Sequence, residues 1–262
     1  LNHLALRGEA RRHGVPLGIR GCSSEIPILW SFSMPAVISG LVTAPAMWAG
    51  KSILVNQPEG YASLGTITVA ESWRLVPLFL CSMIAQANLP IMTQLHSAGN
   101  MSSFRKVLGA QFCLNGVIAL VGAVAVSIFA RPIMAAYGPD FKADSIVLIL
   151  VIISTVPMQL TTVIGSLNRC IGKIWWNAFL NGSWAVSYVL GTILLVEYKA
   201  IGLALSLFIA YSLQFILAIL YVYVVIWRSS HLRSCVSCSN KRRTTSWDSY
   251  GDSRESDGHG VQ

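Results

Sequence analysis

Two ionisable residues, Glu71 and Arg74, lie inside a long apolar segment and are the first candidates for chemistry. They are three residues apart, so in a helix they share one face and each partly neutralises the other. An ionisable side chain among apolar ones suggests function, because exposing it to lipid costs free energy. Arg74 offers a planar fork of donors that suits a phosphate or pyrophosphate group, with Glu71 holding it in place. The alternative is an ion pair near the membrane interface with a structural role alone.

Side-chain amides recur in the apolar segments. They are Gln86, Asn88, Gln111, Asn115, Gln159, Asn181 and Gln214. Such residues line a hydrated cavity in some membrane proteins and join neighbouring helices by hydrogen bonds in others. The first four of these amides join Arg74 and Glu71 as candidate substrate-binding residues.

The first apolar segment contains Pro35 and Pro45, with Gly40 between them. A proline inside a helix removes a backbone donor and clashes with the preceding turn. We therefore expect these three residues to form a hinge in a bent, moving helix. A static kink that serves packing is the alternative.

Catalytic and metal-binding patterns are not found in the sequence. It has no P-loop, no H-E-x-x-H, no G-x-S-x-G and no paired acidic motif. Cys235 and Cys238 have metal or redox spacing, but no second pair accompanies them, so two thiols in a flexible tail are the favoured interpretation. We expect no enzyme, no cofactor and no metal.

Six uncharged runs provide the elements that would position these residues. They cover 26–50, 75–104, 107–130, 145–168, 174–196 and 200–227. A helix needs about 20 apolar residues to cross a hydrocarbon core roughly 30 Å thick. The runs do not alternate apolar and polar residues as transmembrane strands do. The sequence therefore predicts an all-α, polytopic membrane protein with six transmembrane helices.

Charge divides the chain into three parts. Of 262 residues, 54% are hydrophobic and 11% are charged, whereas an ordinary soluble domain is about 25% charged. We expect a basic tail or linker over 1–25, a transmembrane lobe over 26–227 and a disordered cytoplasmic tail over 228–262. The second helix is expected from near Tyr61 to about Met92, with a polar connection from Thr93 to Arg105.

Lys and Arg residues predict the orientation. With six spans, 14 of them lie on the side of both termini and 4 on the other side. Cytoplasmic loops carry the excess of Lys and Arg, so we expect a multi-pass protein of the inner (plasma) membrane with both termini cytoplasmic. The basic charge then fits contact with anionic lipid in the bilayer, and no nucleic-acid partner is expected.

Several short motifs occur in an order that resembles a known family. They are Glu25–Ala36, Gly60–Gly65, Glu71–Arg74, Asn88–Pro90, Tyr137–Phe141 and Leu167–Lys173. Over residues 25–227 the chain resembles the C-terminal half of a Wzx-type polysaccharide flippase. That family belongs to the MATE/MOP superfamily, which also contains MATE multidrug exporters and MurJ-like lipid II flippases.

The resemblance implies a fold of two six-helix lobes around a cavity that opens alternately to each side of the membrane. The cargo would be a polyprenyl-pyrophosphate-linked oligosaccharide, moved from the inner to the outer leaflet during surface polysaccharide biosynthesis. Since one lobe is present, the partners implied are this lipid-linked substrate, the bilayer and a missing N-terminal lobe or second subunit. We expect the chain to be a C-terminal lobe or a fragment.

Other functions remain open on the sequence. A MATE-like cation-coupled exporter would need an acidic ion-binding cluster deep in the helices. A non-transporting scaffold subunit of glycan assembly would have a wholly apolar core between its helices, whereas a polar cavity facing a missing partner lobe would favour transport. A membrane-bound transferase is the third alternative.

Overall fold

The computed structural model describes residues 30, 33–138, 141 and 144–224. These residues are helical or lie in short turns, with no strand among them. The helices are α3 (Met34–Val55), α4 (Gly60–Ser97), α5 (Met101–Ile128), α6 (Ala130–Tyr137), α7 (Ser145–Ile153), α8 (Thr155–Cys170), α9 (Ile174–Leu194) and the short 3-10 helix η4 (Val196–Tyr198). A last helix covers 199–224. The all-α prediction is confirmed for these ranges, while the two predicted tails and the Cys235–Cys238 pair lie outside them.

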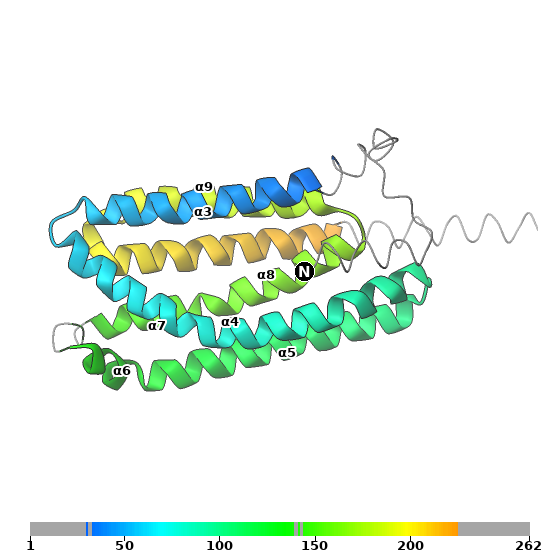
Figure 1. Cartoon of the computed structure of the whole chain (residues 1–262), viewed down its shortest axis with the longest axis horizontal. Helices are drawn as coiled ribbons and strands as arrows, with labels where there is room; N and C mark the ends of the chain where they lie inside the picture. The colour runs from blue at the N-terminus through cyan, green and yellow to red at the C-terminus, as the bar shows by residue number, and fades with distance from the viewer. Residues whose placement is uncertain (1–29, 31–32, 139–140, 142–143, 225–262) are drawn as a thin grey trace, which may run out of the picture. The chain divides into compact units, whose positions relative to one another are not determined.

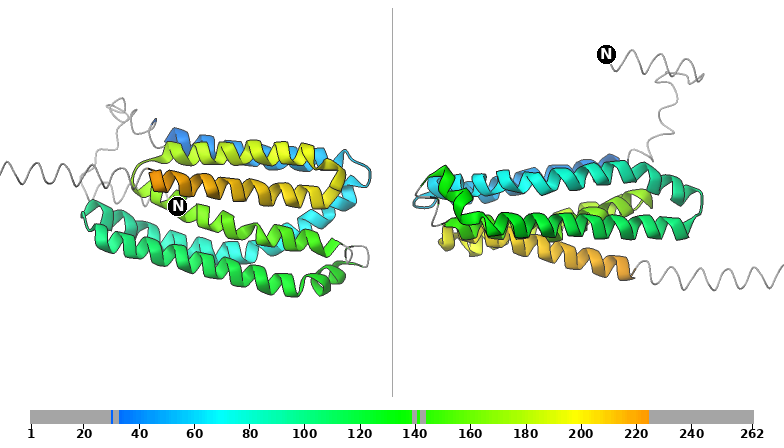
Figure 2. Two further views of the ribbon diagram at one scale, coloured as in Figure 1. Left: turned by 180° about the vertical axis from the view of Figure 1, so that it is seen from behind. Right: turned by 90° about the horizontal axis from the view of Figure 1, so that it is seen from below.

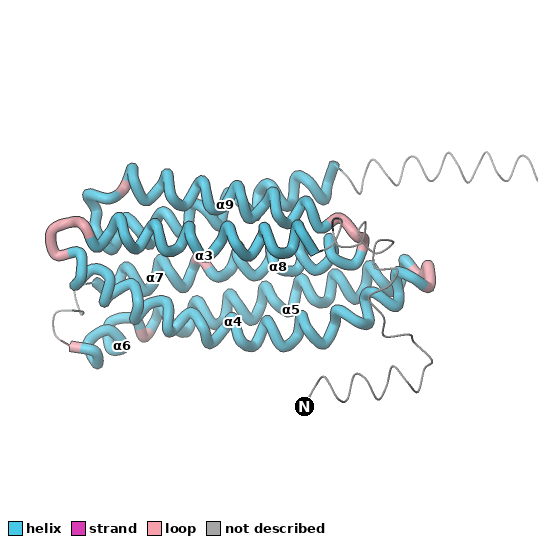
Figure 3. The backbone as a smooth tube through the Cα atoms, turned by 45° about the horizontal axis from the view of Figure 1, so that its top comes forward, coloured by secondary structure: helices cyan, strands magenta, loops and turns pink. Residues whose placement is uncertain are grey.

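The helices up to Gln214 form one bundle (Figure 1). Helix α3 packs against α9 and α4, α4 against α5, and α5 against α7 and α8. The view from behind in Figure 2 shows α9 beside α3, and Figure 3 shows how short the described turns are. Residues 215–224, which belong to a second unit, continue the last helix.

The bundle has two ends, named here after residues in their turns. The Asn100 end holds the start of α3, the α4–α5 turn and the α8–α9 turn (Figure 1). The Glu59 end holds the α3–α4 turn, α6 and the turn before the last helix. By the Lys and Arg distribution, the Asn100 end is the expected cytoplasmic side.

Within the described ranges, five helices are long and apolar enough to cross a membrane. These spans are Met34–Val55, Gly60–Ser97, Met101–Ile128, Ser145–Cys170 and Val196–Val224. The prediction of six such spans is therefore one too many. The predicted span that is not among these five is α9, which is 21 residues long and uncharged. It carries asparagine, serine and tryptophan among its apolar residues, and its polar residues have a place in the bundle described below.

The second and third helices are longer than predicted. The polar segment from Thr93 to Arg105 is almost wholly helical, and only 98–100 separate α4 from α5. At about 1.5 Å per residue, the 38 residues of α4 exceed a hydrocarbon core of about 30 Å. The His96 ring lies 5.7 Å from that of Phe104, and Asn100 Oδ1 accepts a hydrogen bond from Ser103 N at 3.2 Å. Polar composition marked the end of the apolar segment, whereas the helix continues beyond it.

The fourth predicted span is interrupted between α7 and α8 at Ser154. Pro157 has no N–H for the carbonyl of Ile153, and its ring clashes with the preceding turn. Two hydroxyls bond backward here: Ser154 Oγ donates to Val151 O at 2.6 Å and Thr155 Oγ1 to Ile152 O at 2.6 Å. Such local compensation lets a membrane helix tolerate a break.

The residues predicted to form a hinge in α3 lie in one continuous helix. Pro35 is in its first turn and Pro45 is in its interior. A proline in the first turn is tolerated, because the N–H it lacks would have no partner there. Gly40 is exposed, and a Cβ built on it would meet nothing within 4 Å. In this structure the interruption of a span lies in the fourth span and not in α3.

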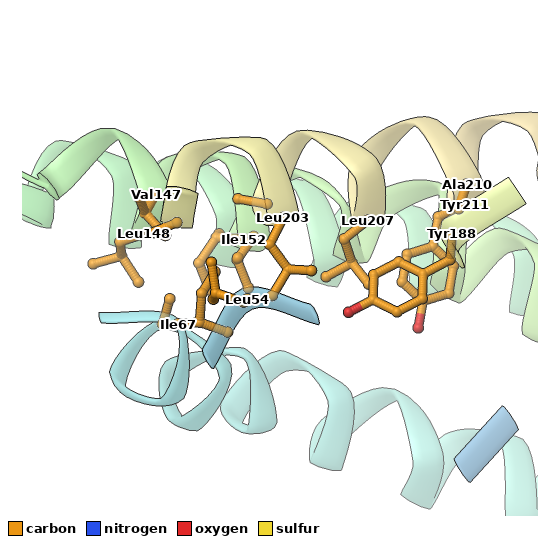
Figure 4. Close-up of a cluster of buried hydrophobic side chains, with 14 of the residues drawn as sticks. Leu54, Ile67, Val147, Leu148, Ile152, Tyr188, Leu203, Leu207, Ala210 and Tyr211 are labelled. Atoms are coloured by element: carbon orange, nitrogen blue, oxygen red, sulfur yellow. The ribbon is translucent and has the colours of Figure 1, made fainter. Parts of the chain in front are cut away.

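The buried amides lie away from the main aliphatic cluster. The aliphatic cluster in Figure 4, which includes Leu54, Ile67, Leu148 and Ile152, lies toward the Glu59 end. The buried amides of the described residues lie near the middle of their helices or toward the Asn100 end: Gln111, Asn115, Gln159, Asn168 and Gln214. Hydrogen-bonding amides are therefore buried from mid-bundle to the Asn100 end.

The Glu59 end is closed by a tight turn and an ion pair. A Cβ on Gly60 would lie 2.4 Å from the carbonyl oxygens of Leu54 and Val55, so the turn requires glycine. Lys199 Nζ donates to Glu59 Oε2, which ties the α3–α4 turn to the start of the last helix. This hydrogen bond, together with the charge of Lys199, holds the pKa of the Glu59 carboxyl below its usual range.

Candidate functional site

A cavity of about 340 Å³ lies between α3, α8, α9 and the last helix. Its polar lining residues are Ser39, Thr43, Thr161, Thr162, Arg169, Asn177, Asn181 and Gln214. Along α9 it extends from Ile174 to Trp184, which is about 15 Å at 1.5 Å per residue. The cavity therefore reaches about halfway through a hydrocarbon core of roughly 30 Å.

A network of amides holds one wall of the cavity. Asn181 Nδ2 donates to Ser39 Oγ, and Gln214 Nε2 donates to Asn181 Oδ1 at 2.9 Å. These bonds join α9 to α3 and to the last helix. An amide oxygen has two lone pairs and an amide nitrogen has two N–H groups. Asn181 therefore keeps an acceptor and a donor position beyond the network.

A second amide pair joins α9 to α8. Asn177 Nδ2 donates to Gly165 O at 3.1 Å, and Asn177 Oδ1 accepts from Asn168 Nδ2 at 2.9 Å. Both contacts fix the orientation of the Asn177 amide, which also lines the cavity. The lining is thus a set of positioned hydrogen-bonding groups, since its amides are tied to neighbouring helices.

Arg169 is the one charged residue among the described lining of this cavity. It lies in the last turn of α8 at the Asn100 end and is exposed. Its Nη2 donates to Ser166 Oγ at 2.8 Å. The end of the cavity at this exposed guanidinium, named here the mouth, therefore carries a positive charge.

Aromatic rings form the opposite, closed end. The rings of Trp184 and Tyr188 stack with centroids 5.4 Å apart and planes 3° apart, and Trp184 lies 5.2 Å from Tyr211. Figure 4 shows both tyrosines beside the aliphatic cluster. Trp184 and Tyr211 line the cavity, and the indole N–H of Trp184 is buried without a hydrogen-bond acceptor among the described residues. The cavity therefore ends in aromatic rings, with an unpaired donor at that end.

The two charged candidates, Glu71 and Arg74, lie near this closed end but are not paired with each other. Glu71 Oε2 forms an ion pair with Lys51 Nζ at 2.6 Å. The expected pairing of Glu71 with Arg74 is thus wrong, because α3 supplies the partner. Arg74 is 9% exposed, and its Nε and Nη1 have no hydrogen-bond partner among the described residues. Tyr188 and Tyr211 of that closed end are among its neighbours.

The four candidate amides lie apart from the cavity lining. Gln111 and Asn115 are buried on α5, and their side-chain nitrogens and oxygens lack hydrogen-bond partners among the described residues. Because Cys81 Sγ contacts Asn115 O across two antiparallel helices, Asn88 falls close to the level of Gln111. Gln86 is exposed. The structure therefore buries two of these amides on α5, places half-buried Asn88 near their level on α4 and leaves Gln86 exposed.

The cavity residues were not selected from the sequence, although a signal was present. Thr161, Gly165 and Arg169 follow at intervals of four on α8, and Asn177 and Asn181 do so on α9. Residues four apart share a helix face, so these positions describe two polar stripes. In the sequence Asn181 is one amide among several, and Arg169 stands out only as part of the motif Leu167–Lys173.

No protein-family model, curated protein or solved structure matches this chain. Across the described ranges, no three His, Cys, Asp or Glu side chains gather as metal ligands. The groups that the site offers to a ligand are amides, hydroxyls, aromatic rings and one guanidinium. This set can hydrogen-bond, stack and attract an anion.

Proposed function

We propose that this chain forms a lobe of a membrane translocase, a flippase for polyprenyl-pyrophosphate-linked oligosaccharide units. The observation that supports this proposal is the cavity between α3, α8, α9 and the last helix up to Gln214, which has amides and hydroxyls in its lining. In a scaffold such amides would only join neighbouring helices, whereas here they also line a cavity. A polar cavity facing a missing partner lobe was the feature expected to favour transport, and this cavity lies within the one lobe.

The chemistry of the cavity suits a glycan headgroup. A sugar–pyrophosphate group cannot cross hydrocarbon unaided, because its hydrogen bonds to water have no replacement there. Amides and hydroxyls replace those bonds, and both line the cavity. The polyprenyl tail stays in lipid throughout.

The one-sided form of the cavity supports an alternating-access cycle. The mouth is at Arg169 and the far end is closed by Trp184, Tyr188 and Tyr211 with aliphatic packing beyond them. With the orientation predicted from Lys and Arg, the mouth faces the cytoplasm of a plasma-membrane protein. A second lobe or subunit would complete the transport path that the resemblance implies.

Transbilayer movement of a labelled substrate tests the proposal. The 262-residue chain is reconstituted in proteoliposomes that carry a fluorescent polyprenyl-pyrophosphate-linked glycan, and dithionite quenching reports the outer-leaflet fraction over time. We expect exchange between leaflets that is at least about tenfold faster than in protein-free liposomes. An unchanged rate would contradict transport by this chain without a second lobe and favour a scaffold.

A matched pair of glycine substitutions links movement to the cavity. Gly165→Leu places a branched side chain in the lining, whereas Gly109→Leu makes the same change on an exposed face of α5 where a Cβ meets nothing within 4 Å. We expect the first variant to lose movement and the second to keep it. Equal rates in the two variants would show that the cavity is not the path.

A further inference from the structure

We propose that the cavity takes one glycosyl unit of its ligand at a time, sugar first, with the phosphate of that ligand at Arg169 in the mouth. The inference deepens the proposed function, on which it rests for the ligand class, a lipid-linked sugar phosphate. It assigns different parts of the ligand to opposite ends of the cavity.

The charge distribution along the cavity determines the orientation. Arg169 is the cation of the described lining, and no carboxylate lines the cavity. An arginine binds phosphate through charge-assisted hydrogen bonds, which are about twice as strong as neutral ones. A phosphate therefore finds its partner at the mouth, and the interior offers groups suited to an uncharged part of the ligand.

The interior has the features of a sugar site. Asn181 retains an acceptor and a donor position, and Trp184 and Tyr211 present ring surfaces. The hydroxyls of Thr43, Thr161 and Thr162 line the same cavity, and a threonine hydroxyl can accept a hydrogen bond from a sugar hydroxyl.

The size of the cavity limits how much of a glycan enters. Its volume of about 340 Å³ lies at the lower end of the roughly 300–1,000 Å³ range of ligand pockets. The closed end at Trp184 prevents a longer glycan from extending further. The unit next to the phosphate is the one that would enter, since phosphate and sugar are joined and the phosphate stays at the mouth.

Equilibrium binding of two short-chain probes tests this arrangement. The probes are citronellyl pyrophosphate and citronellyl pyrophosphate-linked N-acetylglucosamine, titrated calorimetrically against the full chain in nanodiscs. We expect the sugar probe to bind about tenfold more tightly, the gain of one or two hydrogen bonds at roughly 1 kcal/mol each. A probe with two sugars should bind no better than the probe with one.

Three variants separate the two ends of the cavity. Asn181→Leu should abolish the preference for the sugar probe while retaining binding of the sugarless probe, which also shows that the variant is folded. Arg169→Gln should lower the affinity for both probes about tenfold. Arg105→Gln, the same change at an exposed position outside the cavity lining, should leave both affinities unchanged.

Three results would overturn the arrangement. The first is equal affinity of the wild-type chain for the sugar probe and the sugarless probe, and the second is an equal loss of affinity for both probes in Asn181→Leu. The third is tighter binding of the two-sugar probe than of the one-sugar probe. These measurements need no movement across the bilayer. Sugar-selective binding without transbilayer movement would contradict transport by this chain without a second lobe and leave this arrangement standing. Movement that is insensitive to Asn181→Leu and Arg169→Gln would refute the arrangement alone.

Discussion

Gly50 on α3 is the position where a single methyl group has the least room beside the candidate site. A Cβ there would lie 2.4 Å from Tyr188 Oη and 2.6 Å from Tyr188 Cε1. Tyr188 is 1% exposed and stacks on Trp184, so its ring cannot move without disturbing the closed end of the cavity. The close packing of α3 on α9 therefore depends on this glycine.

We expect Gly50→Ala to lower stability by about 1–3 kcal/mol, the usual result of overpacking. The measurement is the thermal unfolding midpoint of the detergent-solubilised protein. Gly40→Ala is the matched control on the same helix, since a Cβ there meets nothing within 4 Å and alanine favours a helix by about 1 kcal/mol. Equal midpoints in the two variants would contradict the packing described here.

At this scale the sequence identified unusual residues but not their neighbours. Glu71 and Arg74 were selected because they are ionisable residues in a predicted span, and that property needs no structure. The partner of Glu71 is Lys51, twenty residues earlier, on another helix. Such a contact is set by how two helices pack, which spacing along one of them cannot indicate.

We expect the joint between α7 and α8 to move, because α7 is packed in the core and α8 lines the cavity. Val147, Leu148 and Ile152 of α7 are fully buried in the aliphatic cluster, while α8 supplies Thr161 and Arg169 to the cavity. Rotation at Ser154 would move the cavity wall relative to the core.

Pro157→Ala restores the N–H that a continuous helix uses, so we expect α7 and α8 to become more rigidly joined. Transbilayer movement of the labelled glycan should fall severalfold, while the thermal midpoint stays equal or rises. Pro132→Ala, in the first turn of α6 where that N–H is not needed, should leave the rate unchanged. A Pro157→Ala protein with the wild-type rate would show that the joint does not limit transport.

Elements were predictable where lipid is the solvent. Five of the six uncharged runs overlap spans that are long and apolar enough to cross a membrane, because hydrocarbon permits few charges. The same reasoning failed at residues 93–105, where a helix continues beyond the expected apolar segment, and at α9, whose asparagines face the cavity. Composition reports the surroundings of a segment more directly than its backbone conformation.

Orientation across the bilayer belongs to the whole molecule and is measurable with two cysteines. In a version whose six native cysteines are replaced by alanine, Ala98→Cys lies in the turn at the Asn100 end and Pro58→Cys in the turn at the Glu59 end, both exposed. We expect a membrane-impermeant maleimide to label Pro58→Cys in intact cells and Ala98→Cys only after permeabilisation. The reverse pattern would place the mouth of the cavity outside.

The long pair of helices α4 and α5 offers a practical opening at its tip. Gly99 has a φ of +71°, and nothing lies within 4 Å of where its Cβ would be. A peptide epitope or a fluorescent domain grafted after this residue would stand clear of both lipid and cavity. The protein could then be purified and tracked through its middle, with both chain ends left untagged.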